Sequence, residues 1–283
     1  MIAVTGASGT IGSLVAGRLA THHALRLLTR HPERLAGSFA DAELVRADYS
    51  DPPSLRRALQ GVDAALLVTN DPLADHDRPF VQAARSAGVR HLVKLSAAAV
   101  EDAGADDLIT SWQRRNERII RSSGLDWTFL RPRAFMSNAL SWAPGIRSDG
   151  VVRALHGASL NSCVDPRDVA DVAVQALARK LPVGTAHRLT GPTALSPRMQ
   201  TALLSRALGR SLTFEELDAG QARAHLERQL PRPVAEALLR SAQRQYAGAK
   251  RQVTTEVEDL LGRPARSFRT WATDHAYRFT ERT

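Results

Sequence analysis

Three glycines stand at three-residue spacing near the start of this chain, at Gly6, Gly9 and Gly12. The short apolar run 2–4 precedes them, and apolar residues at helical spacing follow, which predicts a strand, a tight turn and a helix. A helix N-terminus offers unpaired N–H groups and the positive end of a dipole, which suits a pyrophosphate. Gly6 would permit the turn, Gly9 would admit phosphate close to the backbone, and Gly12 would let the helix pack against the strand.

The turn therefore predicts a dinucleotide site. Its expected cofactor contacts are Gly6, Ser8, Gly9, Thr10, Ile11 and Gly12. The spacing differs from the commoner G-x-G-x-x-G fingerprint, so a glycine-rich turn that holds no ligand is the alternative.

The end of the second predicted strand bears on which dinucleotide would bind. An NAD-preferring site carries an acidic residue near this point for the ribose 2′-hydroxyl, whereas here the strand runs into Arg30 and His31. Arginine suits a 2′-phosphate because its planar guanidinium forms two charge-assisted hydrogen bonds at once. We therefore predict NADPH as the cofactor. The alternative is that both residues are solvated in a turn.

Residues that follow three other predicted strands complete the expected cofactor site. Asp48 is placed to meet the adenine, or it only starts the turn that follows it. Thr69 and Asn70 end the fourth strand and should approach the ribose. Pro132 follows the sixth strand and should lie near the nicotinamide.

The elements that must position these residues alternate along the chain. Strands are expected at 1–5, 24–29, 43–48, 63–69, 90–96, 126–131 and 186–190, with helices at 10–20, 53–60, 76–88, 109–123 and 166–179. This alternation predicts an α/β fold, a Rossmann-like doubly wound parallel sheet with helices on both faces.

Helices dominate the rest of the chain, at 196–208, 218–229, 232–249 and 265–278. We interpret them as a smaller, mostly helical substrate lobe, with an independent helical interaction domain as the alternative. The expected division is a NADP-binding core of residues 1–135 plus 165–192, and a substrate-binding lobe of residues 136–164 plus 193–283.

Composition narrows the classes of protein. The formal net charge is +9 over 283 residues, but the arginines are scattered among acidic residues, which argues against nucleic-acid binding. No apolar run reaches the roughly 18 residues that span a membrane, and no signal peptide is visible. Cys163 is the only cysteine, which fits a reducing cytoplasm. The histidines show no metal-ligand spacing, and nothing indicates an oligomeric state.

Several segments, in order, resemble the NmrA-like branch of the atypical short-chain dehydrogenases/reductases. They are Thr5–Gly12, Ala87–Val93, Ser123–Pro132, Phe135–Asn138, Asp165–Ala170 and Leu189–Pro192. The resemblance runs over roughly residues 1–215 and implies an NAD(P)H-binding fold. The family contains quinone reductases, carbonyl reductases and redox-sensing regulators without turnover.

The helix at 109–123 departs from this family. Most active short-chain reductases carry a Tyr-x-x-x-Lys pair there, in which the lysine lowers the tyrosine pKa and the tyrosine protonates the substrate oxygen. Two registers are possible here, Ile109 with Gln113 or Trp112 with Asn116. None of these side chains is an acid near neutral pH. They either pack the helix or line the substrate pocket.

Other residues are candidates for the reaction itself. Ser96 ends the fifth strand, where the resemblance implies a carbonyl-polarising hydroxyl, so we predict a catalytic role; bonding to its own backbone is the alternative. We predict that Trp112, Phe135 and Asn138 contact the substrate, with ordinary packing as the alternative. Lys94 should point into or under the sheet, or else supply a proton.

A second match to the Tyr-x-x-x-Lys spacing, Tyr246 with Lys250, stands far too late in the chain. We interpret it as a chance occurrence.

Two functions of different classes fit these residues. The first is an NADPH-dependent reductase, or ketoreductase, that transfers hydride to a ketone or quinone without a tyrosine acid. A small aromatic, polyketide-like substrate is compatible with it. The second is a non-catalytic NADP(H)-sensing regulator.

Overall fold

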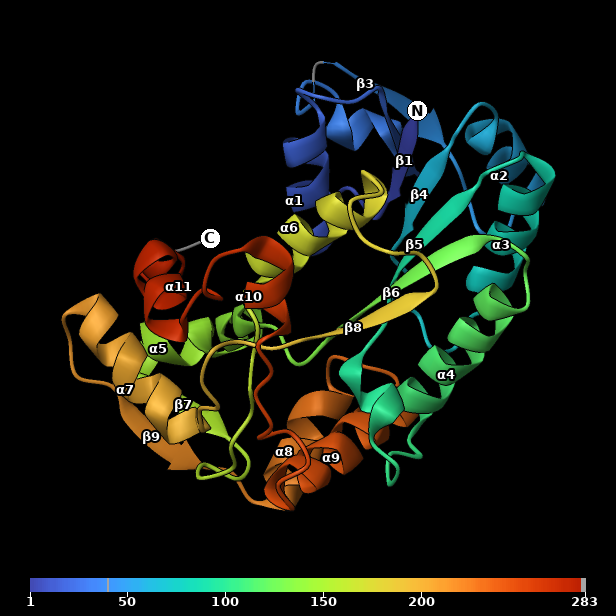
Figure 1. Ribbon diagram of the computed structural model, residues 1–283. Coiled ribbons are helices and arrows are strands. Elements are labelled where there is room, and N and C mark those ends of the chain that lie inside the picture. The colour runs from blue at the N-terminus through green and yellow to red at the C-terminus, as the bar shows by residue number, and fades with distance from the viewer. Residues whose placement is uncertain (40, 281–283) are drawn as a thin grey trace. The chain divides into compact units, whose positions relative to one another are not determined.

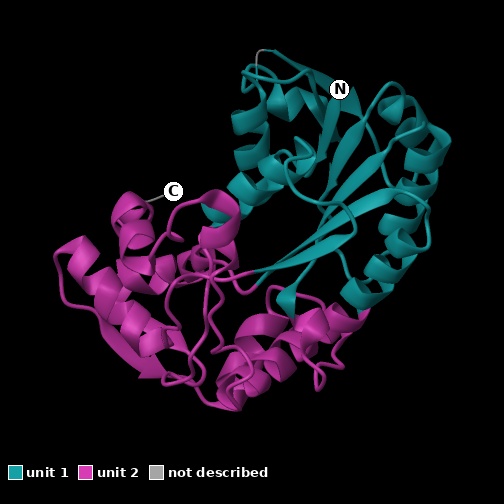
Figure 2. Cartoon of the chain, viewed as in Figure 1, with its two compact units in different colours: residues 1–98, 112–132, 166–188 teal, residues 99–111, 133–165, 189–283 magenta. Residues whose placement is uncertain are grey.

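Two compact units make up the chain in the computed structural model, which describes residues 1–39 and 41–280. Unit 1 comprises residues 1–98, 112–132 and 166–188, and unit 2 comprises residues 99–111, 133–165 and 189–283 (Figure 2). The main difference from the predicted division is the segment 99–111, which belongs to unit 2 although it lies between elements of unit 1.

A seven-stranded sheet forms the centre of unit 1, in the order β3-β2-β1-β4-β5-β6-β8. Its strands are β1 (Ile2–Thr5), β2 (Leu25–Thr29), β3 (Ala42–Arg46), β4 (Ala64–Leu67), β5 (His91–Leu95), β6 (Asp126–Pro132) and β8 (Thr185–Leu189). The first six pair in parallel along this order. The predicted Rossmann-like α/β fold is confirmed.

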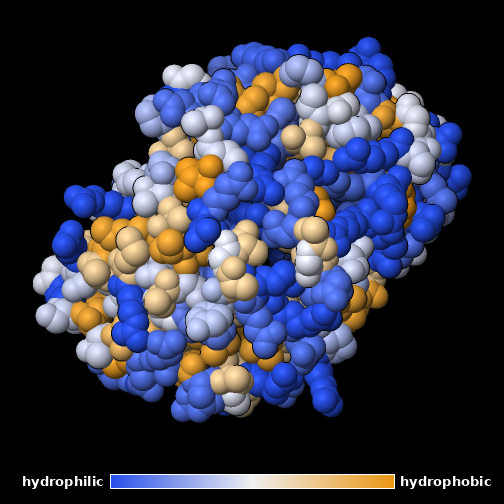
Figure 3. Space-filling model, turned by 60° about the horizontal axis from the view of Figure 1, so that its bottom comes forward, coloured by the Kyte–Doolittle hydropathy of each residue, from blue (hydrophilic) through white to orange (hydrophobic). Residues whose placement is uncertain are grey.

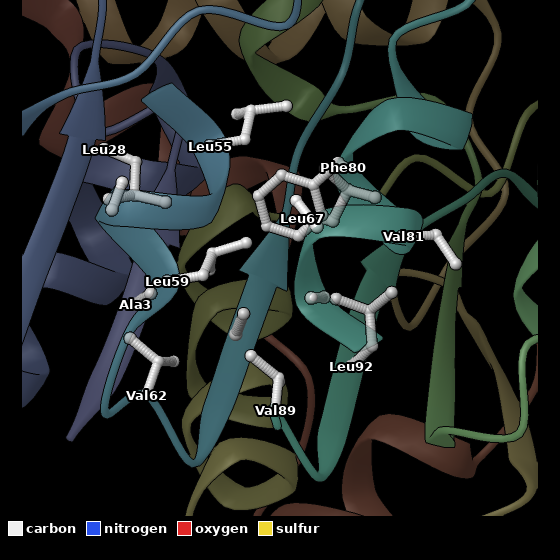
Figure 4. Packing of buried hydrophobic residues seen from close by; sticks show 14 of the residues in the cluster. Ala3, Leu28, Leu55, Leu59, Val62, Leu67, Phe80, Val81, Val89 and Leu92 are labelled. Atoms are coloured by element: carbon white, nitrogen blue, oxygen red, sulfur yellow. The ribbon is translucent and has the colours of Figure 1, made fainter. Parts of the chain in front are cut away.

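Helices cover both faces of this sheet (Figure 1). They are α1 (Thr10–Leu19), α2 (Pro52–Leu59), α3 (Asp77–Ser86), α4 (Leu108–Arg121) and α6 (Pro166–Leu177). Helices α1 and α6 pack against each other, as do α2 and α3. Under α2 and α3 lies a core in which Leu67 and Leu92 from the strands meet Leu55, Leu59 and Phe80 from the helices (Figure 4).

The strand order positions a ligand site. The chain builds β1, β2 and β3 in one direction and then crosses back to build β4, β5 and β6 in the other. The order reverses between β1 and β4, and doubly wound sheets bind ligands at the carboxyl ends of the strands at such a point. The segments that follow Thr5 and Leu67 are therefore the ones to inspect for a cofactor.

Unit 2 is mostly helical. It contains α5 (Ala143–Asp149), α7 (Pro197–Leu208), α8 (Ala219–Glu227), α9 (Arg232–Tyr246), α10 (Glu256–Leu261) and α11 (Phe268–Asp274). A two-stranded parallel sheet of β7 (Val151–Ala154) and β9 (Thr213–Glu216) accompanies them. Short 3-10 helices complete the chain at Pro32–Leu35, Ala98–Glu101, Met136–Trp142 and Ala276–Phe279.

Hydrophilic residues predominate on the face of the molecule that Figure 3 presents, with smaller groups of hydrophobic residues between them. Charged residues make up 24% of the chain, so a surface of this kind is expected. None of the helices in the described part of the chain has the length and apolar character needed to cross a membrane.

Candidate functional site

The glycine turn has the geometry of a phosphate cradle. Gly6 has a φ of +66°, which favours glycine, and its carbonyl accepts a hydrogen bond of 2.8 Å from the Gly9 amide. A Cβ at Gly12 would lie 2.1 Å from the Gly6 carbonyl oxygen, so only glycine fits where α1 crosses the turn. The N-cap residue of α1, Gly9, has no capping side chain. The first amides of the helix are thus left for an anion.

A cavity of about 240 Å³ runs from this turn to the carboxyl ends of β2 and β4. Five predicted cofactor residues line it, namely Gly6, Ser8, Gly9, Arg30 and Asn70. The others are not among its lining residues; these are Thr10, Ile11, Gly12, His31, Asp48, Thr69 and Pro132.

Arg30 is the cation of this cavity. Its side chain is exposed, and no carboxylate in the described part of the chain pairs with it. The neighbouring acids are engaged elsewhere. Glu33 lies 3.1 Å from the ring of His31, and Asp48 Oδ1 accepts bonds of 2.9 and 2.7 Å from the Ser50 amide and hydroxyl. These two bonds, more than the charge of Arg30, hold the pKa of Asp48 below its usual range. The guanidinium is therefore available to a phosphate.

The other wall of the cavity is apolar and was missed by the sequence analysis. It includes Ala47, Tyr49 and Leu55. The Tyr49 hydroxyl donates to the Val68 carbonyl at 3.3 Å, and its ring stacks on His76 at 4.7 Å between ring centres. Burial raises the pKa of Tyr49 to about 12, so its hydroxyl stays protonated. A surface of this kind suits an adenine ring. The only signal in the sequence was the position of Tyr49 directly after Asp48.

Beside the cavity, Thr69 belongs to a buried network. Lys94 Nζ donates to the Thr69 hydroxyl at 2.6 Å and lies 2.8 Å from a carboxylate oxygen of Asp77, while Thr69 donates to the other oxygen at 2.7 Å. Lys94 and Asp77 are fully buried. The Thr69 side chain is thus held inside unit 1. The contact of Thr69 with the cofactor stays a prediction, and its backbone would have to make that contact.

Ser96 lies in a second buried network. Its hydroxyl donates to Glu117 at 2.7 Å, and the guanidinium of Arg131 holds the same carboxylate through two bonds of 2.9 and 2.5 Å. The Ser96 hydroxyl has a single proton to donate, and it donates that proton in the hydrogen bond to Glu117. The catalytic role of Ser96 therefore stays a prediction, and it would require this hydrogen bond to be exchanged for one to the substrate.

The buried face of α4 carries polar atoms that lack partners. Trp112, Gln113 and Asn116 are all buried. Trp112 Nε1, Gln113 Oε1 and both amide atoms of Asn116 have no hydrogen-bond partner among the described residues. Leaving a buried polar atom unpaired costs about 1–3 kcal/mol, which makes such a cluster a candidate ligand site. Neither predicted register places an acid here.

The remaining candidates lie in unit 2. Phe135 is partly buried, and its carbonyl accepts a bond of 3.0 Å from the amide of the exposed Asn138. Tyr246 is 71% exposed, whereas Lys250 is partly buried and donates to the Ser241 hydroxyl at 2.7 Å. Tyr246 packs its ring on His156 instead of meeting Lys250 as an acid pair would.

Comparison with known proteins decides the family. A family model described as NAD(P)H-binding matches residues 6–180, which include the glycine turn, Arg30 and the buried face of α4. The chain belongs to this NAD(P)H-binding family. The predicted nicotinamide cofactor is thereby confirmed as a property of the family.

Two relatives that match almost the whole chain are reductases. It is 56% identical over 279 residues to a (4-alkanoyl-5-oxo-2,5-dihydrofuran-3-yl)methyl phosphate reductase of Streptomyces griseus subsp. griseus, covering 99% of both chains. It is 34% identical over 291 residues to an NAD(P)H azoreductase of Xenophilus azovorans, again covering 99% of both. The structure is similar to that of an NADPH-dependent quinone oxidoreductase from Escherichia coli complexed with NADPH, with a TM-score of 0.85, 25% identity and coverage of 98% and 100%.

The residues present fit such a cofactor. The crowding at Gly12 and the open amides of α1 suit a pyrophosphate, and Tyr49 offers an apolar wall for a base. Arg30 offers a charge for a 2′-phosphate. The site therefore has a place for each part of a dinucleotide's adenosine half.

Proposed function

We propose that this protein is an NADPH-dependent reductase of an electron-poor carbon–carbon double bond, and that its substrate is a phosphorylated 4-alkanoyl-5-oxo-2,5-dihydrofuran or a close analogue. The identity of 56% along 99% of both chains with a reductase of that substrate is the observation that carries this proposal. A shared fold alone would not argue for a shared reaction, so the proposal rests on this identity and on the chemistry of the site.

In this proposal, the glycine turn holds the pyrophosphate of NADPH and Arg30 holds its 2′-phosphate. When bound, NADPH supplies the hydride. The protein contributes orientation and a pocket that excludes water, which are the protein's main tasks in cofactor enzymes.

The absence of a tyrosine acid supports this reaction. The chain has three tyrosines in all. Tyr49 lines the cofactor cavity with a pKa raised to about 12, while Tyr246 and Tyr277 are 71% and 50% exposed. A simple ketone would need help that a general acid provides, typically worth about 10²–10⁴-fold in rate. The substrate should therefore be one that accepts hydride without an acid.

The furanone meets that requirement. Its ring double bond joins carbons 3 and 4, and carbon 4 carries both the alkanoyl ketone and the lactone carbonyl at carbon 5. Hydride addition at carbon 3 moves the double-bond electrons onto carbon 4, where both carbonyl groups share the charge as an enolate. Water can then donate a proton to carbon 4, which leaves hydroxide. Two of the partnerless atoms on α4, Trp112 Nε1 and Asn116 Nδ2, are hydrogen-bond donors and are therefore suited to binding the carbonyl groups of such a substrate.

The sequence predicts a ketone or quinone of an aromatic polyketide as the substrate. Because the substrate must accept hydride without an acid, we place this class second. Quinones also take up hydride into a delocalised anion, and the structure is similar to that of an NADPH-dependent quinone oxidoreductase. An isolated aromatic ketone does not form such an anion. The substrate contacts proposed for Trp112, Phe135 and Asn138 serve either class.

Loss of NADPH absorbance with a substrate panel tests the proposal. The panel contains the furanone phosphate, simple quinones and polycyclic aromatic ketones. We expect the furanone phosphate to give the highest kcat/KM. With NADPH deuterated at the transferred position, the deuterium should appear on ring carbon 3 of the product. Deuterium on a carbinol carbon would identify a ketoreductase instead.

The second candidate function, a cofactor-sensing regulator without turnover, is favoured by the same missing acid. It predicts tight NADPH binding with no oxidation above background for any member of the panel. That result would overturn the reductase proposal.

A further inference from the structure

Three cations of unit 2, Arg133, Arg244 and Lys250, lie close enough together for the charges of the two arginines to act on Lys250. Arg133 donates to both oxygens of Asp102, at 2.8 Å each. Arg244 donates to Asp107 at 2.6 Å. Lys250, the third cation, donates only to the neutral hydroxyl of Ser241, at 2.7 Å, among the described residues. Each arginine therefore has a carboxylate partner, whereas Lys250 has none among the described residues.

The positive charge of Lys250 is poorly solvated. Lys250 is partly buried, and burial, followed by the charges of Arg244 and Arg133, lowers its pKa to about 8, while Cys163 and Asp102 act in the opposite direction. A cation in such surroundings gains free energy when an anion approaches it.

Each of the two arginines has an N–H donor that is not used in a hydrogen bond. The Nε atoms of Arg133 and Arg244 are both buried, and neither has a hydrogen-bond partner among the described residues. Buried donors without an acceptor are rare and call for an explanation, such as a ligand. Guanidinium groups and an ammonium group are also the side chains that bind phosphate best, because their hydrogen bonds to it are charge-assisted.

We propose that Lys250, Arg244 and Arg133 form the subsite for the phosphate monoester of the substrate. This inference rests on the proposed function, because the phosphate enters through the substrate of the Streptomyces griseus relative. A phosphate dianion supplies the counter-charge that Lys250 lacks and the acceptor oxygens that the two Nε atoms lack. Lys250 and Arg244 are the members that retain some exposure, so the phosphate reaches the cluster from their side.

Lys250 has a rival role that the test must exclude. A lysine whose pKa is close to neutral could protonate a substrate. A proton donor would act on phosphorylated and unphosphorylated substrates alike, whereas a phosphate contact discriminates between them. The decisive quantity is therefore the ratio of kcat/KM for the furanone phosphate to kcat/KM for its free alcohol.

Kinetics on the NADPH-dependent enzyme measures this ratio. We expect Lys250→Met to lower the ratio by about 10- to 100-fold, the range for a lost charge-assisted hydrogen bond. Lys250→Arg should restore most of it. Lys180→Met is the matched control, because Lys180 is exposed and outside the cluster, and it should leave the ratio unchanged. Equal loss on both substrates in Lys250→Met would overturn the phosphate role.

A binding measurement separates failure of this inference from failure of the proposed function. The chain has only three lysines, Lys94, Lys180 and Lys250, so 13C-methylated lysines give resolvable NMR signals. With NADP⁺ saturating the glycine turn, inorganic phosphate should raise the pKa of Lys250 and leave that of Lys180 unchanged. Lys250→Met assigns the signal. No shift, or equal shifts at Lys180 and Lys250, would overturn the subsite even if the furanone is reduced. A selective shift without furanone turnover would instead retain an anion site and overturn the proposed function.

Discussion

Each unit holds a lysine away from full solvent exposure, and the two lysines differ in whether a carboxylate pairs with their charge. In unit 1, Lys94 is fully buried, but it lies 2.8 Å from Asp77 and 2.6 Å from the Thr69 hydroxyl. In unit 2, Lys250 is only partly buried, yet within the part of the chain that the structure describes it donates only to the hydroxyl of Ser241. The more deeply buried lysine is thus the better compensated one.

This contrast distinguishes charges that stabilise the fold as ion pairs from unpaired charges that can bind a ligand. A buried ion pair is costly to break, because removal of one member strands the other in a medium of low dielectric constant. A cation without a counter-ion costs stability in the free protein, and that cost is recovered when an anion binds. Lys94 belongs to the first kind and Lys250 to the second, and the following experiments test the distinction.

The largest effect should follow from Lys94→Met. It leaves the carboxylate of Asp77 buried without its cation, so the free energy of unfolding should fall by about 3–5 kcal/mol. Urea denaturation measures the loss. Adding Asp77→Asn to the same chain removes the stranded charge and should recover part of the stability. A loss below about 1 kcal/mol in the single variant would show that the pair is not the stabilising element we take it for.

The sequence predicts unit 1 better than unit 2, for a physical reason. The strands and helices of unit 1 each carry their own apolar period, and the turn at Gly6 marks the topology. In unit 2, β7 and β9 are only four residues long and are joined to each other from distant parts of the chain. Both strands carry charged residues, Arg153 in β7 and Glu215 and Glu216 in β9, so they lack the continuous apolar run that marks β1 and β4, which are equally short. Helices α5 and α10, with seven and six residues, were also missed.

Side-chain partners were beyond sequence reasoning in both units. Strand ends indicated two of the residues that line the cavity near the glycine turn, Arg30 and Asn70, because carboxyl ends of parallel strands share one edge. The other strand-end candidates, His31, Asp48, Thr69 and Pro132, do not line it. Strand ends did not indicate that the Ser96 hydroxyl would be bonded to Glu117, 21 residues away, or that Lys250 would join Arg133 and Arg244. Such partners depend on packing between elements, which a single sequence does not display.

Arg30, in unit 1, is a second cation without a carboxylate partner among the described residues. Arg30→Ala should weaken NADPH binding by about 10- to 100-fold, because a charge-assisted bond to the 2′-phosphate is worth about 1.5–3 kcal/mol. NADH, which lacks this phosphate, should be little affected. Fluorescence titration with both cofactors measures the two dissociation constants. Arg34→Ala, an exposed arginine of the next turn, is the control. Equal weakening of NADPH and NADH by Arg30→Ala would refute the phosphate contact.

The smallest effect should have the opposite sign to that of Lys94→Met. The pKa of Lys250 falls from 10.5 to about 8 on folding. Below about pH 8 both the folded and the unfolded chain carry this proton, so the folded state bears the full cost of the buried charge. Between about pH 8 and 10.5 the folded chain has lost the proton and the unfolded chain keeps it, so this cost disappears as the pH rises.

Lys250→Met should therefore stabilise the protein at neutral pH, in phosphate-free buffer, by about 1–2 kcal/mol once the lost bond to Ser241 is counted. Urea denaturation at several pH values should show this gain shrinking toward pH 10.5. Lys180→Met, at an exposed site, should change stability by less than about 0.5 kcal/mol at any of them. If Lys250→Met is instead less stable than the natural chain at neutral pH, its charge is compensated as that of Lys94 is. The cluster would then have no need of an anion.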